Sequence, residues 1–585
     1  MPPVKSLLIA NRGEIAVRVI RTARKMGLRT VALYSEIDRN ALHVELAHEA
    51  WNIGTAPASD SYLQGDRIID VARESGADAV HPGYGFLAEN ASFADAVIEA
   101  GLTWVGPPPD AIATMGDKIA SRKAAADAGV EPVPGTLEPL DSLEDVEAAA
   151  AEFGLPVAIK AAHGGGGKGL RVVGEEAELR DALEGAKREA DAYFGSSEVY
   201  VERYIDRPRH VEAQIIVDRE GNSVFMGERD CSVQRRHQKL IEETPSPGMT
   251  EKQRRQLGKA ALAVAEACSY ENAGTIEFLM DPDGNLFFLE MNTRLQVEHT
   301  ITEMVTGIDL VQEQLQVAEG EPLSFAEVDP RGHAIEFRIN AEDPVSDFVP
   351  TPGQIVEYRE PAGQGVRVDS WITPGTNVSQ YYDNLLAKLV VWGRDRDEAI
   401  ARGGRALEEF LLTGVATTIP AHLVVLSHEA FVTDQHHTRF LDDIDFSAIT
   451  HPQAAALPEE ESLEERQVTV EVGGRRFVVR FWVPEPETAP GSARRPAPRR
   501  RPPKLTHSPR QAGAEEGVIT SPMQGTIVKV HVGAGEAVNA GEPICVLEAM
   551  KMENEVQSPI SGEVVDLRVT AGDTVSAGSV IAIVR

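Results

Sequence analysis

Residues 275–299 read TIEFLMDPDGNLFFLEMNTRLQVEH. Apolar residues on both sides of Asp281-Pro282-Asp283-Gly284 predict two strands joined by a tight turn. With Asp283-Gly284 as a two-residue turn, Glu277 lies opposite Glu290 on one face of the hairpin. Side chains placed opposite each other have β-carbons about 5 Å apart. The stretch therefore predicts two facing carboxylates.

Facing carboxylates repel each other unless a cation or a shared proton lies between them. Hard oxygen ligands suit Mg²⁺, which proteins usually bind through one or two carboxylates together with nucleotide phosphates. Asn292 follows on the same face and could complete the ligand set. Glu277, Glu290 and Asn292 are therefore candidate metal ligands, and the alternative is a pair of solvated glutamates on an exposed face.

The end of the same stretch combines three kinds of polar side chain. In an extended segment, Arg294, Gln296 and Glu298 point to one side. A cation, an amide and a carboxylate placed together could hold a small anion and remove a proton from it.

A glycine-rich loop follows the apolar strand Val157–Lys160, and residues 163–169 read HGGGGKG. The next residues are strand-like, whereas a dinucleotide-binding turn needs a helix there. Lys168 is followed by Gly169 and not by Ser or Thr, so this is not a Walker A loop. Four successive glycines predict a flexible loop whose backbone N–H groups fold over phosphates, with a merely flexible turn as the alternative.

The C-terminal segment repeats itself. Ser521-Pro522 recurs at Ser558-Pro559, and the 37-residue offset holds without a gap as far as Ile544 and Ile581. Two copies of one strand–turn unit predict a small β-domain with pseudo-two-fold symmetry. Lys551 lies in the connection between the copies, flanked by two methionines. A lysine on such a tip suits the attachment of a group that must travel, and the alternative is an ordinary surface lysine.

The remaining segments predict further domains. The first hundred residues alternate strands and helices, which is typical of a parallel sheet flanked by helices. Val468–Val472 and Arg475–Val483 predict a hairpin turning at Gly473-Gly474. The Pro-, Ala- and Arg-rich segment that follows predicts an extended linker. Its arginines belong to a solvated tether or to a docking surface for an acidic partner or nucleic acid.

Length, charge and cysteine usage exclude several classes of protein. A chain of 585 residues is too long for one core, and no stretch approaches the roughly 20 apolar residues that span a membrane. A formal net charge of -34 argues against non-specific nucleic-acid binding by the whole molecule. Three distant cysteines argue against a disulfide framework or a structural zinc site. Without a secretory signal pattern, the expected location is the cytoplasm.

At residues 290–299 the chain resembles the signature of biotin carboxylases, which are members of the ATP-grasp superfamily. The resemblance runs from about residue 4 to 448, and Glu548–Met552 resembles the biotinylation motif of biotin carrier domains. As a whole the chain is most similar to acyl-CoA carboxylase α subunits, in particular actinobacterial acetyl/propionyl-CoA carboxylase α chains. Other stretches that carry the resemblance are residues 10–16, 81–85, 228–239 and 338–343.

The resemblance implies a multidomain α/β and α+β chain, in which an ATP-grasp biotin carboxylase precedes a small all-β biotinyl/lipoyl-like domain. The expected domains are an N-terminal Rossmann-like domain at 1–115, an ATP-grasp domain at 116–331 with a mobile lid at about 132–204, a C-terminal carboxylase domain at 332–448, a short connection with the hairpin at 449–484, a flexible linker at 485–516 and the carrier domain at 517–585.

The resemblance also implies a role for each matching residue. Glu298 would be the general base, Lys239 would steady a carboxyphosphate intermediate, and Arg338 would stabilise the enolate-like oxygen of biotin. Bicarbonate would be bound by Arg294, Gln296 and the backbone of Val297, and biotin would be attached to Lys551. Glu277, Glu290 and Asn292 would hold Mg²⁺ or Mn²⁺. ATP would be bound by Lys118, Lys160, Gly164, Gly165, Gly166, Gly167, Glu202, His210, Gln234 and His237.

The implied activity is the ATP- and bicarbonate-dependent carboxylation of biotin on Lys551, the first half-reaction of an acyl-CoA carboxylase. Implied partners are a separate carboxyltransferase β subunit, a biotin protein ligase and further copies of this chain, and the products feed fatty acid or polyketide precursor synthesis. The region between the two recognised parts is shorter than in propionyl-CoA and methylcrotonyl-CoA carboxylase α chains. We therefore expect the hairpin of residues 468–483 to belong to a reduced docking element, or else to pack on the main body.

Three alternatives stay open at this point: another ATP-grasp ligase, a fragment of a pyruvate carboxylase, and a scaffold whose ATP site has decayed. The first two are disfavoured because the carrier domain is attached and because no carboxyltransferase is recognised before it. The choice of acyl-CoA, the stoichiometry with the β subunit and the biotinylation of Lys551 are not determined by the sequence.

Overall fold

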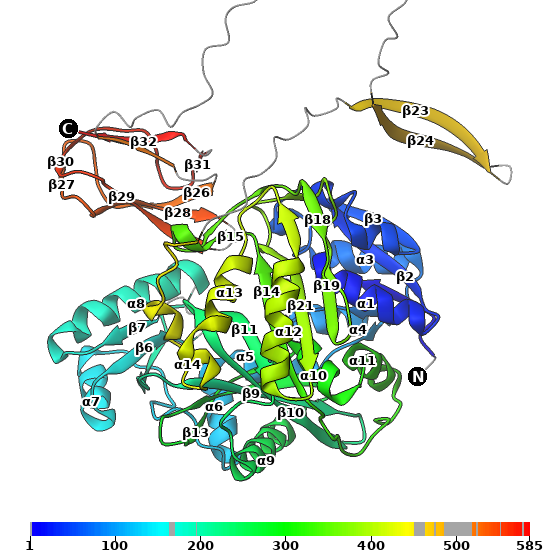
Figure 1. Ribbon diagram of the computed structural model, residues 1–585, viewed down its shortest axis with the longest axis horizontal. Coiled ribbons are helices and arrows are strands. Elements are labelled where there is room, and N and C mark those ends of the chain that lie inside the picture. The colour runs from blue at the N-terminus through cyan, green and yellow to red at the C-terminus, as the bar shows by residue number, and fades with distance from the viewer. Residues whose placement is uncertain are drawn as a thin grey trace, which may run out of the picture. The chain divides into compact units, whose positions relative to one another are not determined.

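The computed structural model describes residues 3–162, 170–194, 196–449, 463–472, 475–484, 517–521, 525–549, 552–575 and 578–585. The chain forms two compact units, the first built from residues 1–452 and the second from most of residues 453–585 (Figure 1). Among the described residues, none of the helices has the length and apolar character needed to cross a membrane. The candidate site residues that the structure describes lie in the first unit.

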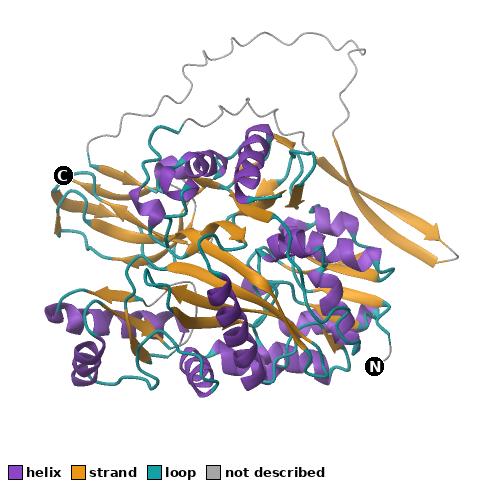
Figure 2. Cartoon of the chain, turned by 60° about the horizontal axis from the view of Figure 1, so that its bottom comes forward, coloured by secondary structure: helices purple, strands orange, loops and turns teal. Residues whose placement is uncertain are grey.

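Unit 1 begins with a parallel sheet in the order β3-β2-β1-β4-β5, as the alternating pattern predicted. Figure 2 shows strands and helices side by side near the N-terminus. Leu7 and Ile9 enter one core with α1, whereas Leu8 enters another with α3, so both faces of the sheet are buried. The elements are β1 (Ser6–Ile9), α1 (Gly13–Lys25), β2 (Arg29–Ser35), α2 (Leu42–Leu46), β3 (Glu49–Gly54), α3 (Gly65–Ser75), β4 (Ala79–His81), α4 (Ala91–Glu99), β5 (Thr103–Trp104) and α5 (Pro109–Gly116).

A three-stranded antiparallel sheet, in the order β7-β6-β8, lies within the segment expected to be a lid. It has its own small core with α7 and α8, to which Val146, Ile159 and Leu183 contribute. The mobility of this segment stays a prediction. Helix α6 (Lys118–Asp127) precedes this segment, whose elements are α7 (Leu143–Phe153), β6 (Val157–Ala161), β7 (Arg171–Val173), α8 (Leu179–Phe194) and β8 (Val199–Arg203).

The centre of unit 1 is an eight-stranded sheet in the order β13-β12-β9-β10-β11-β14-β21-β19. Strand β11 pairs with β14, so one sheet crosses the expected boundary at residue 331. Its elements and neighbours are β9 (Arg209–Val217), β10 (Ser223–Arg235), β11 (Gln238–Thr244), α9 (Glu251–Ala267), β12 (Asn272–Met280), β13 (Leu286–Asn292), α10 (His299–Thr306), α11 (Leu310–Glu319), β14 (His333–Asn340), β19 (Val366–Ser370) and β21 (Leu385–Gly393).

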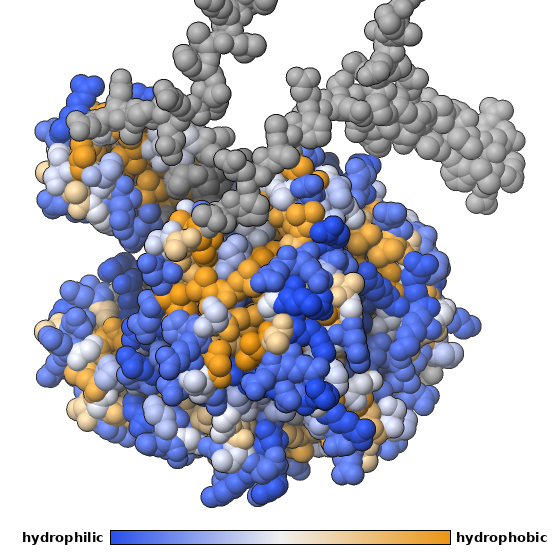
Figure 3. Space-filling model, viewed as in Figure 1, coloured by the Kyte–Doolittle hydropathy of each residue, from blue (hydrophilic) through white to orange (hydrophobic). Residues whose placement is uncertain are grey.

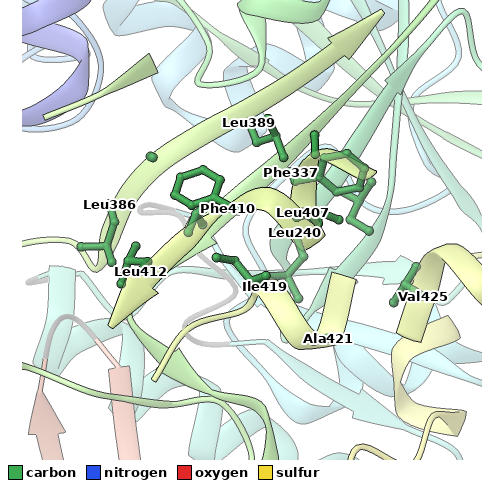
Figure 4. Close-up of a cluster of buried hydrophobic side chains, with 14 of the residues drawn as sticks. Leu240, Phe337, Leu386, Leu389, Leu407, Phe410, Leu412, Ile419, Ala421 and Val425 are labelled. Atoms are coloured by element: carbon green, nitrogen blue, oxygen red, sulfur yellow. The ribbon is translucent and has the colours of Figure 1, made fainter. Parts of the chain in front are cut away.

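Strands β14 and β21 show how this sheet separates a core from a polar face. Phe337 and Leu389 point into an apolar cluster with Leu407 of α12 (Figure 4). Because side chains alternate along a strand, Arg338 and Lys388 point to the opposite face. The remaining elements of unit 1 are β15 (Glu342–Asp343), β16 (Val349–Pro350), β17 (Gly353–Gln354), β18 (Glu357–Arg359), β20 (Asn377–Val378), α12 (Arg396–Glu409), β22 (Leu411–Thr413), α13 (Ile419–Ser427) and α14 (Glu429–Val432).

The hairpin quoted at the outset pairs Glu277 with Glu290, as predicted. The predicted two-residue turn is wrong, however, because Met280 pairs with Leu286 across a five-residue loop. Asp281 organises this loop by accepting hydrogen bonds from the backbone N–H groups of Asp283 (3.0 Å) and Asn285 (2.8 Å). A register shift between Glu277 and Phe278 then restores the predicted pairing.

The surface shown in Figure 3 is mostly hydrophilic, in keeping with the large negative charge of the chain. Apolar side chains gather there around α13 and α14 (Figure 3). Val432, which is 45% exposed, belongs to α14. Most of the charged side chains of the candidate site are buried and do not belong to this hydrophilic surface.

The C-terminal strands of unit 2 confirm the predicted internal repeat. One four-stranded sheet has the order β25-β32-β30-β27, and the other has the order β29-β28-β26-β31. A 37-residue shift carries β26 onto β30, β27 onto β31 and β28 onto β32, so it exchanges the two sheets. The strands are β25 (Val518–Thr520), β26 (Gly525–Val530), β27 (Ala537–Val538), β28 (Pro543–Ala549), β29 (Met552–Gln557), β30 (Gly562–Leu567), β31 (Thr574–Val575) and β32 (Val580–Val584).

The contacts of the two halves repeat with the same offset. The N–H of Gly541 donates to the carbonyl of Ser558, and that of Gly578 donates to the carbonyl of Ser521, both at 2.8 Å. Gly535 and Gly572 both adopt φ near +90°. Lys551, in the connection between the halves, lies outside the described residues, as does the whole of the predicted linker at 485–516.

The hairpin predicted at residues 468–483 is present and longer than expected. Strands β23 (Leu463–Val472) and β24 (Arg475–Pro484) form a two-stranded sheet in which Val472 pairs with Arg475, as a two-residue connection requires.

Candidate functional site

A row of charged residues crosses the eight-stranded sheet. Glu290 on β13 pairs with Glu277 on β12, Glu277 pairs with Glu212 on β9, and Glu212 pairs with Arg229 on β10. Glu277, Glu212 and Arg229 are buried, and Glu290 is half-buried. The row continues along β11, β14 and β21 with Lys239, Glu242, Arg338 and Lys388.

Strand β9 shows why the backbone presents these groups together. Val211, Ala213 and Ile215 belong to the apolar core, and the alternating residues His210, Glu212 and Gln214 lie on the other face. This polar period of two in a buried strand was a signal in the sequence, but Glu212 was not among the predicted site residues.

Lys239 is the centre of the row. Its Nζ donates hydrogen bonds to Glu298 Oε1 (2.6 Å), Glu212 Oε2 (2.7 Å) and Glu277 Oε1 (2.9 Å). Burial alone would lower the pKa of Lys239, but the surrounding anionic groups outweigh it and raise the pKa well above its usual value. Ligand atoms of His210, Glu212 and Glu277 lie within 4.8 Å of one another, but the Lys239 ammonium already supplies this trio with a cation.

The predicted metal ligands lie beside Lys239. Asn292 Nδ2 donates to Glu277 Oε1 (3.0 Å), and Asn292 Oδ1 accepts from Arg294 (3.0 Å). Burial and the adjacent Glu277 raise the pKa of Glu290, which means that an added cation would favour its ionised form. Two carboxylates and an amide oxygen on adjacent strands are the donor set that Mg²⁺ prefers, so the residues present fit this ion.

The predicted anion pocket follows β13. Arg294 Nη1 donates to Gln296 Oε1 (2.7 Å), and Gln296 Nε2 donates to Glu277 Oε1 (3.1 Å). Arg294 Nε also donates to Glu89 Oε2 (3.1 Å), a contact that sequence reasoning missed. The segment is not extended throughout, as the prediction assumed, because Val297 and Glu298 form a turn before α10. The structure still brings Arg294, Gln296 and Glu298 together around Glu277 and Lys239.

Glu298 precedes the first residue of α10 and is fully buried. Its Oε1 accepts from Lys239, and its Oε2 accepts from Arg338 Nη2 at 2.9 Å. Burial would raise the pKa of Glu298, but Lys239 and Arg338 outweigh it and hold the pKa well below its usual value. Glu298 is therefore ionised, with a cation on each oxygen.

Arg338 links Glu298 to a second buried carboxylate. Its Nε donates to Glu242 Oε1 (2.5 Å), while His422 and Thr418 contact its backbone carbonyl. Burial raises the pKa of Glu242 to about 8, an effect that Arg338 only partly offsets. The Arg338 guanidinium thus bridges the Glu242 carboxyl group and the Glu298 carboxylate, and it binds the Glu298 oxygen that Lys239 does not.

The predicted phosphate ligands form a separate group. Lys160 on β6 forms an ion pair with Glu202 on β8, and Arg122 Nη1 lies 3.3 Å from the other oxygen of Glu202. Lys118 is the first residue of α6, and burial lowers its pKa although Glu290 opposes that effect. Gly164, Gly165, Gly166 and Gly167 lie outside the described residues.

The other three predicted ATP ligands lie on β9 and around the β10–β11 turn. His210 Nε2 is 3.0 Å from Glu277 Oε2, without the alignment of a hydrogen bond, and its Nδ1 is 3.3 Å from Gln234 Nε2. Burial lowers the pKa of His210, but Glu277 outweighs it, so the net shift is upward. His237 is exposed in the turn at φ +64°.

Four family models match the chain in order. They are described as "Biotin carboxylase, N-terminal domain" (residues 3–112), "Carbamoyl-phosphate synthase L chain, ATP binding domain" (117–326), "Biotin carboxylase C-terminal domain" (336–443) and "Biotin-requiring enzyme" (517–584).

Relatives and solved structures agree with these matches. The chain is 47% identical over 564 residues to the biotin-dependent acyl-coenzyme A carboxylase alpha3 subunit of Mycobacterium leprae, which covers 94% of each chain. It is 51% identical over 445 residues to biotin carboxylase 1 of Bacillus subtilis, covering 76% of this chain and 99% of that one. The solved biotin carboxylase domain of Hydrogenobacter thermophilus 2-oxoglutarate carboxylase, in complex with MgADP, ADP and bicarbonate, matches with a TM-score of 0.74 and 45% identity over 76% of this chain and 98% of that one.

An ATP-grasp sheet with this row of carboxylates and cations, joined to an internally symmetric β-domain, defines an ATP-dependent ligase that acts on biotin. The chain belongs to the biotin carboxylase family, and it has the domain composition of an α subunit that carries its own biotin domain. The fold class expected from the sequence is thereby confirmed.

Proposed function

We propose that the chain carries out the first half-reaction of an acyl-CoA carboxylase, in which biotin on Lys551 is carboxylated at the expense of ATP. The observation that carries this proposal is the pairing of Glu298 with Lys239 and Arg338, next to the pocket of Arg294 and Gln296. A base, two cations and an anion pocket at one point are what the activation of bicarbonate requires.

Bicarbonate becomes an electrophile only after phosphorylation. Arg294, Gln296 and the backbone N–H of Val297 hold the anion, and Glu298 accepts its proton. The bicarbonate oxygen forms a bond to the γ-phosphorus of ATP while the bond to the β-phosphate oxygen breaks, which yields carboxyphosphate and ADP. Lys118 and Lys160 are placed to neutralise phosphate oxygens, and Mg²⁺ held by Glu277, Glu290 and Asn292 supplies further charge neutralisation when bound.

The ion pairs of Glu298 regulate its basicity. With Lys239 and Arg338 on its two oxygens, Glu298 has a depressed pKa and is a weak base. Bound substrates draw these cations away, because Lys239 then neutralises phosphate or carboxyphosphate and Arg338 turns to the ureido oxygen of biotin. The loss of both partners raises the pKa of the buried carboxylate, so Glu298 becomes a stronger base when the site is filled.

Arg338 serves the second step. The ureido nitrogen of biotin is a poor nucleophile until its carbonyl oxygen is stabilised as an oxyanion. A guanidinium at this oxygen favours transfer of the N–H proton to a phosphate oxygen of carboxyphosphate. The nitrogen then bonds to the carboxyl carbon while the bond from that carbon to the phosphate oxygen breaks and hydrogen phosphate leaves. Glu242 keeps Arg338 oriented in the meantime.

We further propose that the product is passed to a separate carboxyltransferase β subunit that acts on acetyl-CoA or propionyl-CoA, with a biotin protein ligase modifying Lys551. The mycobacterial relative, an acyl-CoA carboxylase α subunit by name, supports this choice. The β23–β24 register supports a docking role for the hairpin. Val468 pairs with Val479 and Val470 pairs with Phe477 in a two-stranded sheet, and such a sheet alone is marginally stable.

The test is the ATP-dependent transfer of labelled bicarbonate to the biotinylated full chain. We expect label on the native chain, none on Lys551→Arg, and at least a hundredfold lower rate for Glu298→Gln. Glu313→Gln, a buried glutamate that binds Ser324, is the matched control and should label at the native rate. Equal labelling of the native chain and Glu298→Gln would refute the assignment of the base.

A further inference from the structure

Two consecutive peptide carbonyls of the anion pocket are held by buried side chains outside the predicted set. The carbonyl of Gln296 lies 2.8 Å from His299 Nδ1, and the carbonyl of Val297 accepts a hydrogen bond from Lys388 Nζ at 2.7 Å. His299 and Lys388 are both fully buried. They come from different elements, since His299 begins α10 and Lys388 lies on β21.

The chemistry of His299 requires one tautomer. Burial, together with the charges of Lys388 and Arg18, lowers the pKa of His299 well below its usual value, so the ring is neutral. The Gln296 carbonyl can only accept, so Nδ1 carries the proton and donates. His299 Nε2 has no hydrogen-bond partner among the residues that the structure describes. The ring therefore makes a single directed contact, to the pocket backbone.

Lys388 is a buried cation at the junction of three segments. Its Nζ lies 3.2 Å from Glu14 Oε1 at the start of α1 and 5.9 Å from the centre of the Tyr84 ring. On the sheet it pairs with Arg338 on β14 and with Asp369 on β19. Burying an ammonium group is costly unless it is paired and hydrogen-bonded. One of the hydrogen bonds of Lys388 goes to the carbonyl of Val297.

Because peptide groups are planar, a contact that fixes a carbonyl also fixes the direction of the N–H group in the same peptide. The Gln296 carbonyl and the Val297 N–H belong to one rigid plane, and the Val297 carbonyl and the Glu298 N–H belong to the next. His299 therefore sets the direction of the Val297 N–H, and Lys388 sets the plane that leads into Glu298. Two successive planes of a turn are fixed before any anion arrives.

We propose that His299 and Lys388 are positioning residues that pre-form the bicarbonate pocket. The inference rests on the proposed function, in which the Val297 N–H binds bicarbonate. Neither residue touches the substrate. They act through the backbone that does, so their loss weakens bicarbonate binding and leaves ATP binding as it is.

The experiment uses the biotinylated full chain and measures the rate of labelled biotin formation at varied bicarbonate and at varied ATP. For Lys388→Met and for His299→Leu, we expect the half-saturating bicarbonate concentration to rise about tenfold and that of ATP to stay the same. His299→Asn, whose amide N–H replaces the Nδ1 donor, should recover most of the loss. Arg12→Met is the matched control, because Arg12 is a buried cation paired with Asp38 away from the pocket.

Lys388→Met leaves the buried Glu14 carboxylate without its cation, so the single variant could unfold. The double variant Lys388→Met/Glu14→Gln also removes the negative charge, and it replaces the single variant in the test if the single variant unfolds. Unchanged bicarbonate saturation in a folded Lys388 variant and in His299→Leu would overturn the proposal, and so would an equal change for bicarbonate and ATP. Arg294→Met distinguishes a failure of the proposed bicarbonate pocket from a failure of the positioning role of His299 and Lys388. If it leaves bicarbonate saturation unchanged, the proposed pocket itself is wrong, whereas an effect of Arg294→Met alone overturns only the positioning role.

Discussion

Replacing Glu342 by Gln should stabilise unit 1 above pH 7 and change its stability little at pH 5. Glu342 is buried on β15 and accepts hydrogen bonds from Asn384 Nδ2 (2.6 Å) and Asn340 Nδ2 (3.4 Å). Burial raises its pKa from 4.5 to about 7, because the two amides offset the lost hydration only in part.

The sign of the effect follows from the raised pKa. Below pH 4.5 the carboxyl is protonated in both states, and the folded chain has its full stability from this group. As the pH rises towards 7, the unfolded chain releases its proton first, and the folded chain loses stability. Above pH 7 the loss is roughly 3 kcal/mol. For a unit of about 450 residues this corresponds to a Tm difference of about 3 °C, which Glu342→Gln should recover.

Glu243 is the matched control with the opposite shift. Burial would raise its pKa, but hydrogen bonds from His333 (2.8 Å) and Arg396 (2.7 Å) outweigh burial and lower it to about 2. Its carboxylate therefore stabilises the fold above pH 4.5, and this contribution is lost as the pH falls towards 2. Glu243→Gln should lower the Tm by about 3 °C throughout the range from pH 5 to pH 8, with a smaller effect only below about pH 4.5.

The assay is scanning calorimetry of the native chain and both variants at pH 5, 6, 7 and 8. Opposite signs at pH 8, with the Glu342→Gln difference shrinking towards pH 5, would support the reasoning. A lower Tm for Glu342→Gln at pH 8, or the same shift at every pH, would refute it, since neither can result from relief of a buried charge.

Three further outcomes are expected. Lys239→Met should reduce ATP-dependent labelling of biotin at least a hundredfold, because three carboxylates lose their common cation, and an unchanged rate would contradict its central role. Glu290→Gln should raise the Mg²⁺ concentration that half-saturates labelling about tenfold, and identical Mg²⁺ curves would remove Glu290 from the metal site. Gly572→Ala should destabilise unit 2 by about 1–2 kcal/mol in thermal melting, because φ at this position is +96°, which strains a residue with a β-carbon. The added β-carbon would have no atom within 4 Å, so no new contact would offset that strain. Gly533→Ala, at a position without positive φ, should melt like the native chain.

The local sequence pattern was enough to predict several features of the chain. The pairing of Glu277 with Glu290 followed from the strands around one turn, and it survived an error in the turn because a register shift compensated for the longer loop. The C-terminal repeat predicted that the two halves correspond at a 37-residue offset, and the strands confirm it, since each copy folds by the same local rules.

Other parts of the site had no local signal. Glu242 and Lys388 lie in strands outside the recognised motifs, and their partners are far away along the chain. Arg229 lies within the recognised stretch 228–239, but its contact with Glu212 was not predicted. His299 was quoted within a motif, yet its contact with the backbone of Gln296 depends on the turn at Val297 and Glu298. Sequence reasoning could name the residues of a motif but not the contacts that orient them.

The sequence by itself determined the family, the alternation of strands, the facing carboxylates and the symmetric carrier domain, because these depend on spacing over a few to about forty residues. Only the tertiary structure decided that strands from both sides of residue 331 join in one sheet, and that Lys239, Arg338 and Glu298 meet there. The physical reason is that the order of the strands is determined by burial of the whole apolar face of the sheet. That order then brings together the charges on the opposite face. A buried charge requires a partner, and the fold, not the spacing along the chain, determines which partner it finds.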